Sequence, residues 1–129
     1  MKTPADLKYN KTDEWVKPDG NLVTIGISDY AQDQLSDIVF LEFLKNPGDD
    51  FKKGDILASI ESVKAAADII APVSGTVKEI NESIVDAPET LNEDPYEKGW
   101  LFKAELSNPD EITSLMDADK YNEYCEGRH

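Results

Sequence analysis

The sequence is poor in the residues that enzymes most often use for chemistry. Its 129 residues include one cysteine, Cys125, and one histidine, His129. A single cysteine excludes a disulfide framework and disfavours a cysteine-based metal site. A single histidine at the end of the chain disfavours Ser-His-Asp and Cys-His arrangements. The sequence therefore offers little material for a catalytic or metal centre.

Long apolar runs and an excess of positive charge are also missing. No apolar stretch approaches the length of a membrane span, and residues 1–6 lack both a signal core and an Arg/Ser-rich transit character. We therefore expect a cytoplasmic protein, or a mitochondrial matrix protein if this is a mature eukaryotic form. The 27 acidic and 13 basic side chains give a net charge of −14. That charge argues against nucleic acid and favours a monomer that meets basic surfaces on partner proteins. The alternative is an acidic surface that is only solvated.

The remaining pattern predicts one small domain built mainly from β-strands. The length fits a single domain over 1–129, with a core at about 7–106 and a helical tail at about 109–126. Short strands are expected at intervals along the chain, and a short helix is expected after Ser28 or Asp29, which can cap it. The expected strands are 22–27, 37–44, 56–62, 75–80 and 100–106.

Residues 81–94 are polar, contain Pro88, and are expected to form a long connection with a short extended piece. In the tail, Asn108 and Pro109 are typical of a helix start. Asp117 can cap a second helix that reaches about residue 126. The expected apolar positions are Ile112, Leu115 and Met116 in the first tail helix, and Ala118, Tyr121 and Cys125 in the second.

A weak internal repeat suggests how the strands are arranged. Residues 53–58 and 98–103 each begin with Lys-Gly and continue as an apolar strand. The strands that precede them, 37–44 and 75–80, also correspond. A repeated half on each side of a central hairpin would give two related sheets folded face to face, so we expect a flattened barrel or sandwich.

The central hairpin surrounds Lys64. Strand-like residues 55–60 lead into the stretch 61–68, and residues 69–73 lead away from it. A charged side chain between two apolar strands belongs at an exposed turn, because burying an unpaired ammonium group is costly. The small residues 65–67 leave the backbone beside the lysine accessible to a modifying enzyme. The alternative is a surface lysine that is only solvated.

The surrounding residues resemble the lipoyl-attachment segment of the H protein of the glycine cleavage system. The resemblance extends from about Leu7 to about Cys125. This chain departs from the family pattern at Asp13, where the family usually has a histidine, and at residues 43–48, where a Leu-Pro turn is usual. The matching residues are Lys8-Tyr9, Glu14-Trp15-Val16, Thr24-Ile25-Gly26-Ile27, Asp29-Tyr30-Ala31-Gln32, Asp37-Ile38-Val39-Phe40, Glu61-Ser62-Val63-Lys64-Ala65, Ala71-Pro72-Val73-Ser74-Gly75, Val77 with Glu79, Asn92 with Asp94-Pro95-Tyr96, and Gly99-Trp100-Leu101.

This resemblance implies a barrel-sandwich hybrid fold like that of lipoyl domains, with lipoic acid joined to Lys64 as an amide. It implies that Glu61 and Gly75 help the lipoylating enzyme to recognise the hairpin. It also implies that Glu14 and Asp68 lie near the loaded arm, where a carboxylate could bind an amine. The plainer alternatives are that Glu14 and Asp68 are surface acids and that Gly75 starts a strand with a special φ angle.

The resemblance further implies a shuttle substrate and not a catalyst. The arm would take the aminomethyl group from glycine decarboxylase and deliver it to the tetrahydrofolate-dependent aminomethyltransferase. Dihydrolipoyl dehydrogenase would then reoxidise the dithiol, and a lipoate ligase or lipoyl transferase would attach the cofactor. The cofactor would carry the chemistry while the protein displays and orients it.

Three other functions stay open at this point. Some H-like proteins pass lipoyl groups to 2-oxoacid dehydrogenases, and that relay needs the same hairpin. Biotin carriers are structural cousins, but they place methionines on both sides of the lysine, whereas Val63 and Ala65 flank Lys64 here. The third is an unmodified H-like protein that acts only through protein contacts.

Overall fold

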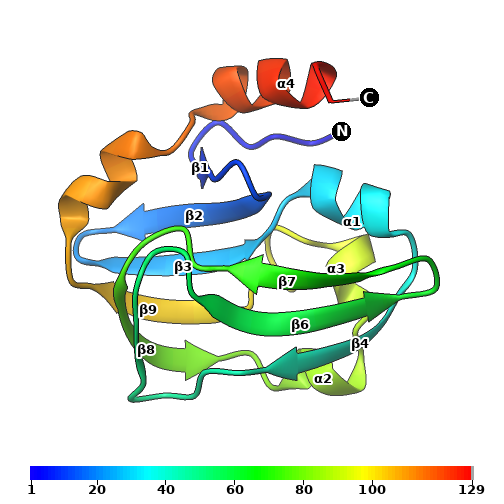
Figure 1. The fold of residues 1–129 in the computed structure, drawn as a ribbon, viewed down its shortest axis with the longest axis horizontal. Helices are drawn as coiled ribbons and strands as arrows, with labels where there is room; N and C mark the ends of the chain where they lie inside the picture. Colours follow the sequence, from blue (N-terminus) through cyan, green and yellow to red (C-terminus); the bar gives the residue numbers. More distant parts are fainter. Residues whose placement is uncertain (129) are drawn as a thin grey trace.

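The computed structural model describes residues 1–128 and places their strands in two antiparallel sheets (Figure 1). The larger sheet has the strand order β1-β2-β3-β9-β8-β5, and the smaller has the order β4-β6-β7. The expectation of a mainly β protein with two sheets is confirmed. The strands are β1 (Lys8–Tyr9), β2 (Glu14–Asp19), β3 (Leu22–Ile27), β4 (Ile38–Phe43), β5 (Asp50–Phe51), β6 (Ile56–Ser62), β7 (Ala66–Ile70), β8 (Gly75–Ile80) and β9 (Phe102–Leu106).

Alternation along β3 shows why these segments form half-buried strands. Val23, Ile25 and Ile27 are buried and point to one face, as the period of two requires. β3 pairs with β2 on one side and β9 on the other. The β2–β3 hairpin closes at Gly20, whose φ of +62° is a left-handed conformation that glycine adopts without steric cost.

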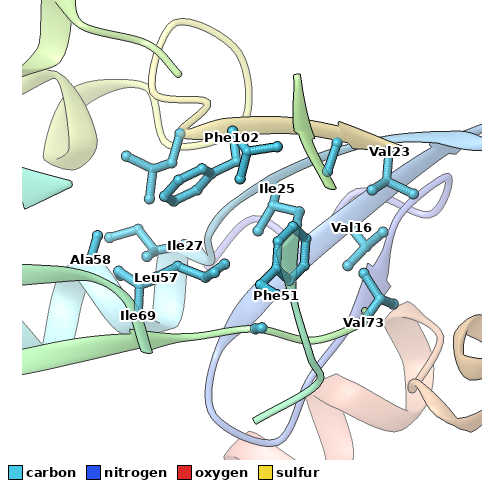
Figure 2. Packing of buried hydrophobic residues seen from close by; sticks show 14 of the residues in the cluster. Val16, Val23, Ile25, Ile27, Phe51, Leu57, Ala58, Ile69, Val73 and Phe102 are labelled. Atoms are coloured by element: carbon cyan, nitrogen blue, oxygen red, sulfur yellow. The ribbon is translucent and has the colours of Figure 1, made fainter. Parts of the chain in front are cut away.

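The main hydrophobic core lies between the two sheets (Figure 2). Side chains from both sheets meet there: Phe43 of β4 packs edge-on against Phe102 of β9, with ring centroids 5.2 Å apart. Each large apolar side chain that is fully buried stabilises the fold by about 1.5–3 kcal/mol. The core therefore holds the smaller sheet, and the hairpin it contains, against the larger one.

The predicted internal repeat has a counterpart in the strand pairing. β4 pairs with β6 in the smaller sheet, and β8 pairs with β9 in the larger sheet, both antiparallel. The corresponding sequence segments thus form corresponding strand pairs, one in each sheet. The last strand is shorter than expected, because it begins at Phe102 and not at Trp100.

The prediction for residues 81–94 was wrong. This segment forms two single-turn helices, α2 (Ser83–Asp86) and α3 (Thr90–Glu93), in place of a connection with an extended piece. Each turn buries one apolar side chain, Ile84 or Leu91, in the main core. The few apolar residues in this polar stretch give no periodic signal, so the burial of Ile84 and Leu91 was not visible in the sequence.

Helix α1 (Asp29–Leu35) begins as predicted, with the Ser28 hydroxyl accepting a hydrogen bond from the Ala31 amide. In the tail, the first expected helix is a 3₁₀ helix, η1 (Pro109–Ser114), which ends before Leu115 and Met116. Met116 instead exchanges backbone hydrogen bonds with Tyr9. That pairing keeps the chain extended, so the predicted apolar stripe of this helix is incomplete.

Helix α4 (Ala118–Glu126) is capped by the Asp117 carboxylate, as expected, and lies over β1 at the edge of the larger sheet (Figure 1). It forms a second apolar core, named here the aromatic cluster. Tyr9 and Tyr121 stack in it with ring centroids 4.6 Å apart. Burial raises the pKa of the Cys125 thiol. The cluster comprises Leu7, Tyr9, Trp15, Ala118, Tyr121 and Cys125.

None of the helices within residues 1–128 combines the length and the apolar character needed to cross a membrane.

Candidate functional site

The site predicted from the sequence is the turn between β6 and β7. The two strands pair antiparallel as far as Glu61 opposite Ala66. Residues 63–65, named here the hairpin turn, connect them. The Ser62 amide donates to the Ala65 carbonyl oxygen at 2.8 Å, which closes the turn. The expected tight hairpin is confirmed, although its second strand begins at Ala66 and ends at Ile70.

The Ser62 side chain fixes the backbone of the hairpin turn. Its hydroxyl donates to the Ala65 carbonyl oxygen at 3.0 Å and accepts from the amides of Lys64 at 3.1 Å and Ala65 at 3.0 Å. The Val63 amide donates to the Asp37 carbonyl oxygen at 3.0 Å, which ties the turn to the segment before β4. Lys64 is exposed. Within residues 1–128, no hydrogen bond or ion pair engages its Nζ atom, so the amine is available for modification.

A cavity of about 280 Å³ lies beside β7. Ala67 to Ile69 form one wall, and they follow Lys64 in the chain by three to five positions. Helix α1 and residues 12–14 form the other walls. The lining combines apolar and charged groups: Thr12, Asp13, Glu14, Ile27, Tyr30, Ala31, Gln34, Leu35, Ala67, Asp68, Ile69 and Arg128.

Glu14 is a buried acid in this cavity wall, with 1% of its surface exposed. Its Oε2 accepts from the Ile70 amide at 3.1 Å, and its Oε1 accepts from the Thr12 hydroxyl and from Asn10 Nδ2. Burial raises the pKa of Glu14 to about 7, although these hydrogen bonds oppose the shift. The alternative that Glu14 is a simple surface acid was therefore wrong, because strand β2 turns it inward against β7.

Asp68 and Glu61 lie on the strands of the hairpin. Asp68 is exposed, pairs in register with Ser59, and lines the cavity across from residues 12–14. The structure thus brings Asp68 and Glu14 to one cavity. Glu61 is exposed on β6, opposite Phe40 of β4, and is not part of the cavity lining.

Comparison with known proteins connects this geometry to a family. The family model for the glycine cleavage H-protein matches residues 7–128. The chain belongs to the glycine cleavage H-protein family. It is 51% identical to the glycine cleavage system H protein of Staphylococcus saprophyticus over 123 residues, which are 95% of this chain and 97% of that protein. It is 50% identical to the one from Carboxydothermus hydrogenoformans, over 95% of this chain and 94% of that protein.

The fold agrees with a solved H protein. The crystal structure of a glycine cleavage system H protein from Mycobacterium marinum superposes with a TM-score of 0.84. That protein is 33% identical, and the match covers 93% of this chain and 96% of that chain. The barrel-sandwich architecture predicted from the family pattern is therefore confirmed.

Gly75 lies away from the hairpin turn. It is the first residue of β8, which starts at the opposite end of the molecule from the β6–β7 turn (Figure 1). Its φ angle is not left-handed, so the expectation of a special φ was wrong. A Cβ atom at this position would lie 2.2 Å from the Glu105 carbonyl oxygen of β9. Glycine is needed here because two backbones approach closely.

Several cavity residues were not predicted as site residues. Thr12, Tyr30 and Arg128 line the same cavity as Glu14, although Arg128 is more than a hundred residues away in the chain. Nothing in local spacing indicates such a contact. Among the side chains of residues 1–128, no three His, Cys, Asp or Glu groups lie together so as to hold a metal ion.

Proposed function

We propose that this chain is the lipoyl-bearing carrier of a glycine cleavage system, with Lys64 as the attachment residue. The observation that carries the proposal is the exposed Lys64 at the hairpin turn. Ser62 holds its backbone, while its Nζ makes no hydrogen bond or ion pair within residues 1–128. An enzyme can reach such an amine without disturbing the fold. Membership of the H-protein family supports the same role.

The residues beside the hairpin suit a long apolar arm that ends in an amine. Ile27, Leu35 and Ile69 offer apolar wall to the chain of the arm, and Glu14 and Asp68 offer acids for its end. When bound, the lipoyl group supplies a disulfide that can accept a one-carbon amine and two electrons. The protein's part is to display Lys64, to line the cavity, and to hold a carboxylate where an amine could bind it.

We assign two further roles around the hairpin. Glu61 is exposed two positions before the turn begins, where a lipoylating enzyme that approaches Lys64 can contact it. Gly75 acts at a distance, because its close approach to Glu105 keeps β8 and β9 in register. That packing holds the larger sheet against which the hairpin's own sheet rests.

The carrier would receive the aminomethyl group from glycine decarboxylase and deliver it to the aminomethyltransferase. Dihydrolipoyl dehydrogenase would reoxidise it, and a lipoate ligase or lipoyl transferase would modify it beforehand. The chain would be a substrate of all four enzymes and a catalyst of none. We propose a cytoplasmic monomer, since a net charge of −14 opposes self-association.

Mass spectrometry of the protein co-expressed with a lipoate ligase and lipoic acid tests the attachment site. We expect one lipoyl addition, mapped to the peptide that contains Lys64. The Lys64→Arg variant should show none, whereas Lys52→Arg, a matched change at another exposed lysine, should be modified normally. A wild-type protein without the addition would overturn the proposal and favour an unmodified interaction protein.

Glycine–bicarbonate exchange with purified glycine decarboxylase tests the metabolic role. The lipoylated protein should support exchange, and the Lys64→Arg variant should not. A lipoylated protein that supports no exchange, yet donates its lipoyl group to a 2-oxoacid dehydrogenase, would replace the proposed role with that of a lipoyl relay.

A further inference from the structure

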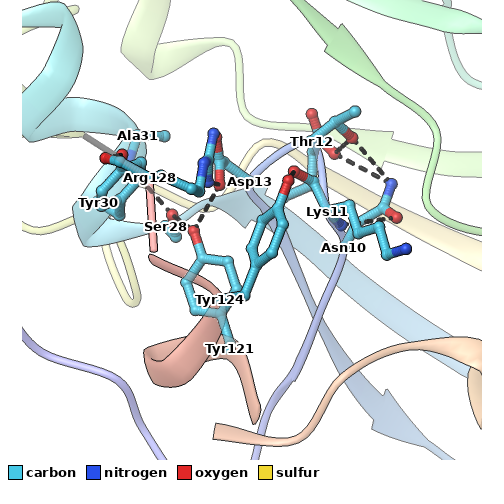
Figure 3. A network of polar contacts seen from close by, with 11 residues as sticks. Asn10, Lys11, Thr12, Asp13, Ser28, Tyr30, Ala31, Tyr121, Tyr124 and Arg128 are labelled. Carbon is cyan, nitrogen blue, oxygen red and sulfur yellow. Dashed lines mark hydrogen bonds and ion pairs between the residues drawn. The ribbon is translucent and has the colours of Figure 1, made fainter. Parts of the chain in front are cut away.

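The cavity beside β7 is built from segments that are far apart in the sequence. Residues 12–14 form one wall, helix α1 forms another, and Arg128 reaches in from the end of helix α4. A network of polar contacts in which α4 takes part connects them (Figure 3).

The first part of the network is a directed chain of hydrogen bonds. The Ala31 amide donates to the Ser28 hydroxyl at 3.1 Å, and the hydroxyls of Ser28 and Tyr121 lie 2.6 Å apart. Tyr121 donates its only hydroxyl proton to Asp13 Oδ1 at 2.8 Å, so Ser28 is the donor toward Tyr121. The start of α1 is thus linked through α4 to Asp13 (Figure 3).

The second part is an ion pair made by Arg128. Its two terminal nitrogens donate to the two oxygens of Asp13, at 2.5 and 2.9 Å. The guanidinium also lies over the rings of Tyr30 of α1 and Tyr124 of α4, 4.5 and 4.7 Å from their centroids. A bidentate pair of this kind fixes geometry as well as charge. Asp13 raises the pKa of Arg128, which keeps the guanidinium charged.

Asp13 is held in a backbone conformation that needs support. Its φ of +80° is uncommon for a residue with a side chain. Its amide donates to the Asn10 carbonyl oxygen, and its own carbonyl oxygen accepts from the Ser28 amide, both at 2.9 Å. Its neighbours on either side, Thr12 and Glu14, line the cavity. The conformation of Asp13 therefore sets where these two side chains point.

We infer that Asp13, Tyr121 and Arg128 form a C-terminal clamp that positions the Thr12–Glu14 wall against helix α1 and so shapes the cavity for the arm. Because Arg128 pairs with Asp13, Glu14 and Asp68 are the cavity acids that have no ion-pair partner within residues 1–128. The claim that the cavity is shaped for the arm rests on the proposed function. The claim that the clamp positions the Thr12–Glu14 wall is independent of it.

The cavity wall can be tested on the unmodified protein. Carbon-13 NMR titration measures the pKa of the Glu14 carboxyl in the folded protein. A substitution that only lowers the stability of the fold therefore leaves the Glu14 pKa unchanged. We expect Arg128→Met and Asp13→Asn to admit water and lower the Glu14 pKa by about one unit or more. Arg128→Lys, which keeps charge without the bidentate fork, should give a smaller shift. Lys120→Met, an exposed control on α4, should give none.

A second measurement addresses the arm. Lipoylated wild-type and variant proteins are charged by the decarboxylase with glycine labelled at its α-carbon, since the carboxyl carbon leaves as CO2. They are then separated from the enzyme and followed for the label that stays on the protein. We expect Arg128→Met to lose label about fivefold faster than wild type, the factor for one partly exposed ion pair. Lys120→Met should match wild type, and the mass of all three proteins should show equal lipoylation.

These outcomes separate the two claims. A Glu14 pKa that is the same in wild type, Arg128→Met and Asp13→Asn would overturn the clamp. Equal retention of label in fully lipoylated variants would overturn its role toward the arm. Absence of lipoylation on Lys64 would overturn the proposed function, while the NMR titration would still decide whether the clamp holds the wall.

Discussion

The hairpin turn and the aromatic cluster are ordered by opposite means. The hairpin turn is exposed, and its side-chain hydrogen bonds join residues two or three positions apart, Ser62 with Lys64 and Ala65. The aromatic cluster is buried, and the hydrogen bonds of Tyr121 join residues about a hundred positions apart, Ser28 and Asp13. Under the proposed function, this local order would let a partner enzyme recognise the turn as a short motif. Long-range order makes the cluster depend on the whole fold.

The largest effect that follows from this comparison is at Tyr121. Tyr121→Ala removes the stack on Tyr9 and the hydrogen bonds to Ser28 and Asp13, and it leaves a cavity in the cluster. We expect the free energy of unfolding to fall by about 3–5 kcal/mol. Urea denaturation measures the loss, and Tyr121→Phe, which keeps the ring, should lose about 1–2 kcal/mol. Equal losses in both variants would show that the ring packing contributes little.

Glu14 connects the second strand of the hairpin to the segment beside the aromatic cluster. It follows Asp13 in the chain, and its carboxylate accepts a hydrogen bond from the Ile70 amide of β7. Its folded pKa of about 7 lies above its ordinary value of 4.5, so the folded state binds more protons between these values. This contribution to stability is present below pH 4.5 and is lost as the pH rises to about 7. Glu14→Gln removes the titration. As the pH rises from about 5 to about 8, the unfolding free energy of this variant should therefore increase by about 2–3 kcal/mol relative to that of wild type.

Urea denaturation of both proteins at the two pH values measures this difference, and costs of the substitution that do not depend on pH cancel. Glu61→Gln, a change at an exposed acid on β6, is the matched control. A pH dependence that is identical in wild type and Glu14→Gln would show that the buried carboxyl does not titrate in this range.

Gly75 shows that a residue assigned to the hairpin by its motif can belong to the sheet. Gly75→Ala brings a methyl group against the Glu105 carbonyl oxygen, and the strands must separate to admit it. We expect a loss of about 2 kcal/mol in unfolding free energy. Gly127→Ala, where the added Cβ would meet only ordinary contacts beyond 3.5 Å, should change stability by less than about 0.5 kcal/mol.

The lipoylation rate of Gly75→Ala, measured well below its melting temperature, separates two roles for this glycine. An unchanged rate in the folded variant supports a purely architectural role. A rate that falls while the variant remains fully folded would show that the lipoylating enzyme contacts the start of β8 directly.

The smallest effect concerns the turn itself. Ser62→Ala removes the hydroxyl that accepts from the Lys64 and Ala65 amides. We expect a loss of only about 1 kcal/mol, since the site is exposed and water can replace the hydroxyl. Hydrogen exchange at the Lys64 and Ala65 amides should become faster. Ser59→Ala in the same strand is the control, and equal exchange in both variants would contradict a role for Ser62.

The same comparison explains how much could be predicted from the sequence. The hairpin, helix α1 with its Ser28 cap and the alternation of β3 were predictable, because turn chemistry, capping and period-two patterns are local. The single-turn helices α2 and α3 were missed, because one buried side chain each, Ile84 or Leu91, leaves no period to detect. The burial of Glu14 and the position of Arg128 in the cavity lining depend on contacts between distant parts of the chain, which a single sequence does not display.

Because Ser62 helps to hold the backbone of Lys64, most of the conformational freedom at this place belongs to the side chain. Rotation about the side-chain bonds moves Nζ over a shell centred on the Lys64 Cα atom. A group joined to Nζ is therefore present near the surface of its own molecule at an effective concentration in the millimolar range or above. Whether that group rests on its own protein or is taken by a partner would then be decided by the contacts at its far end, without any motion of the hairpin.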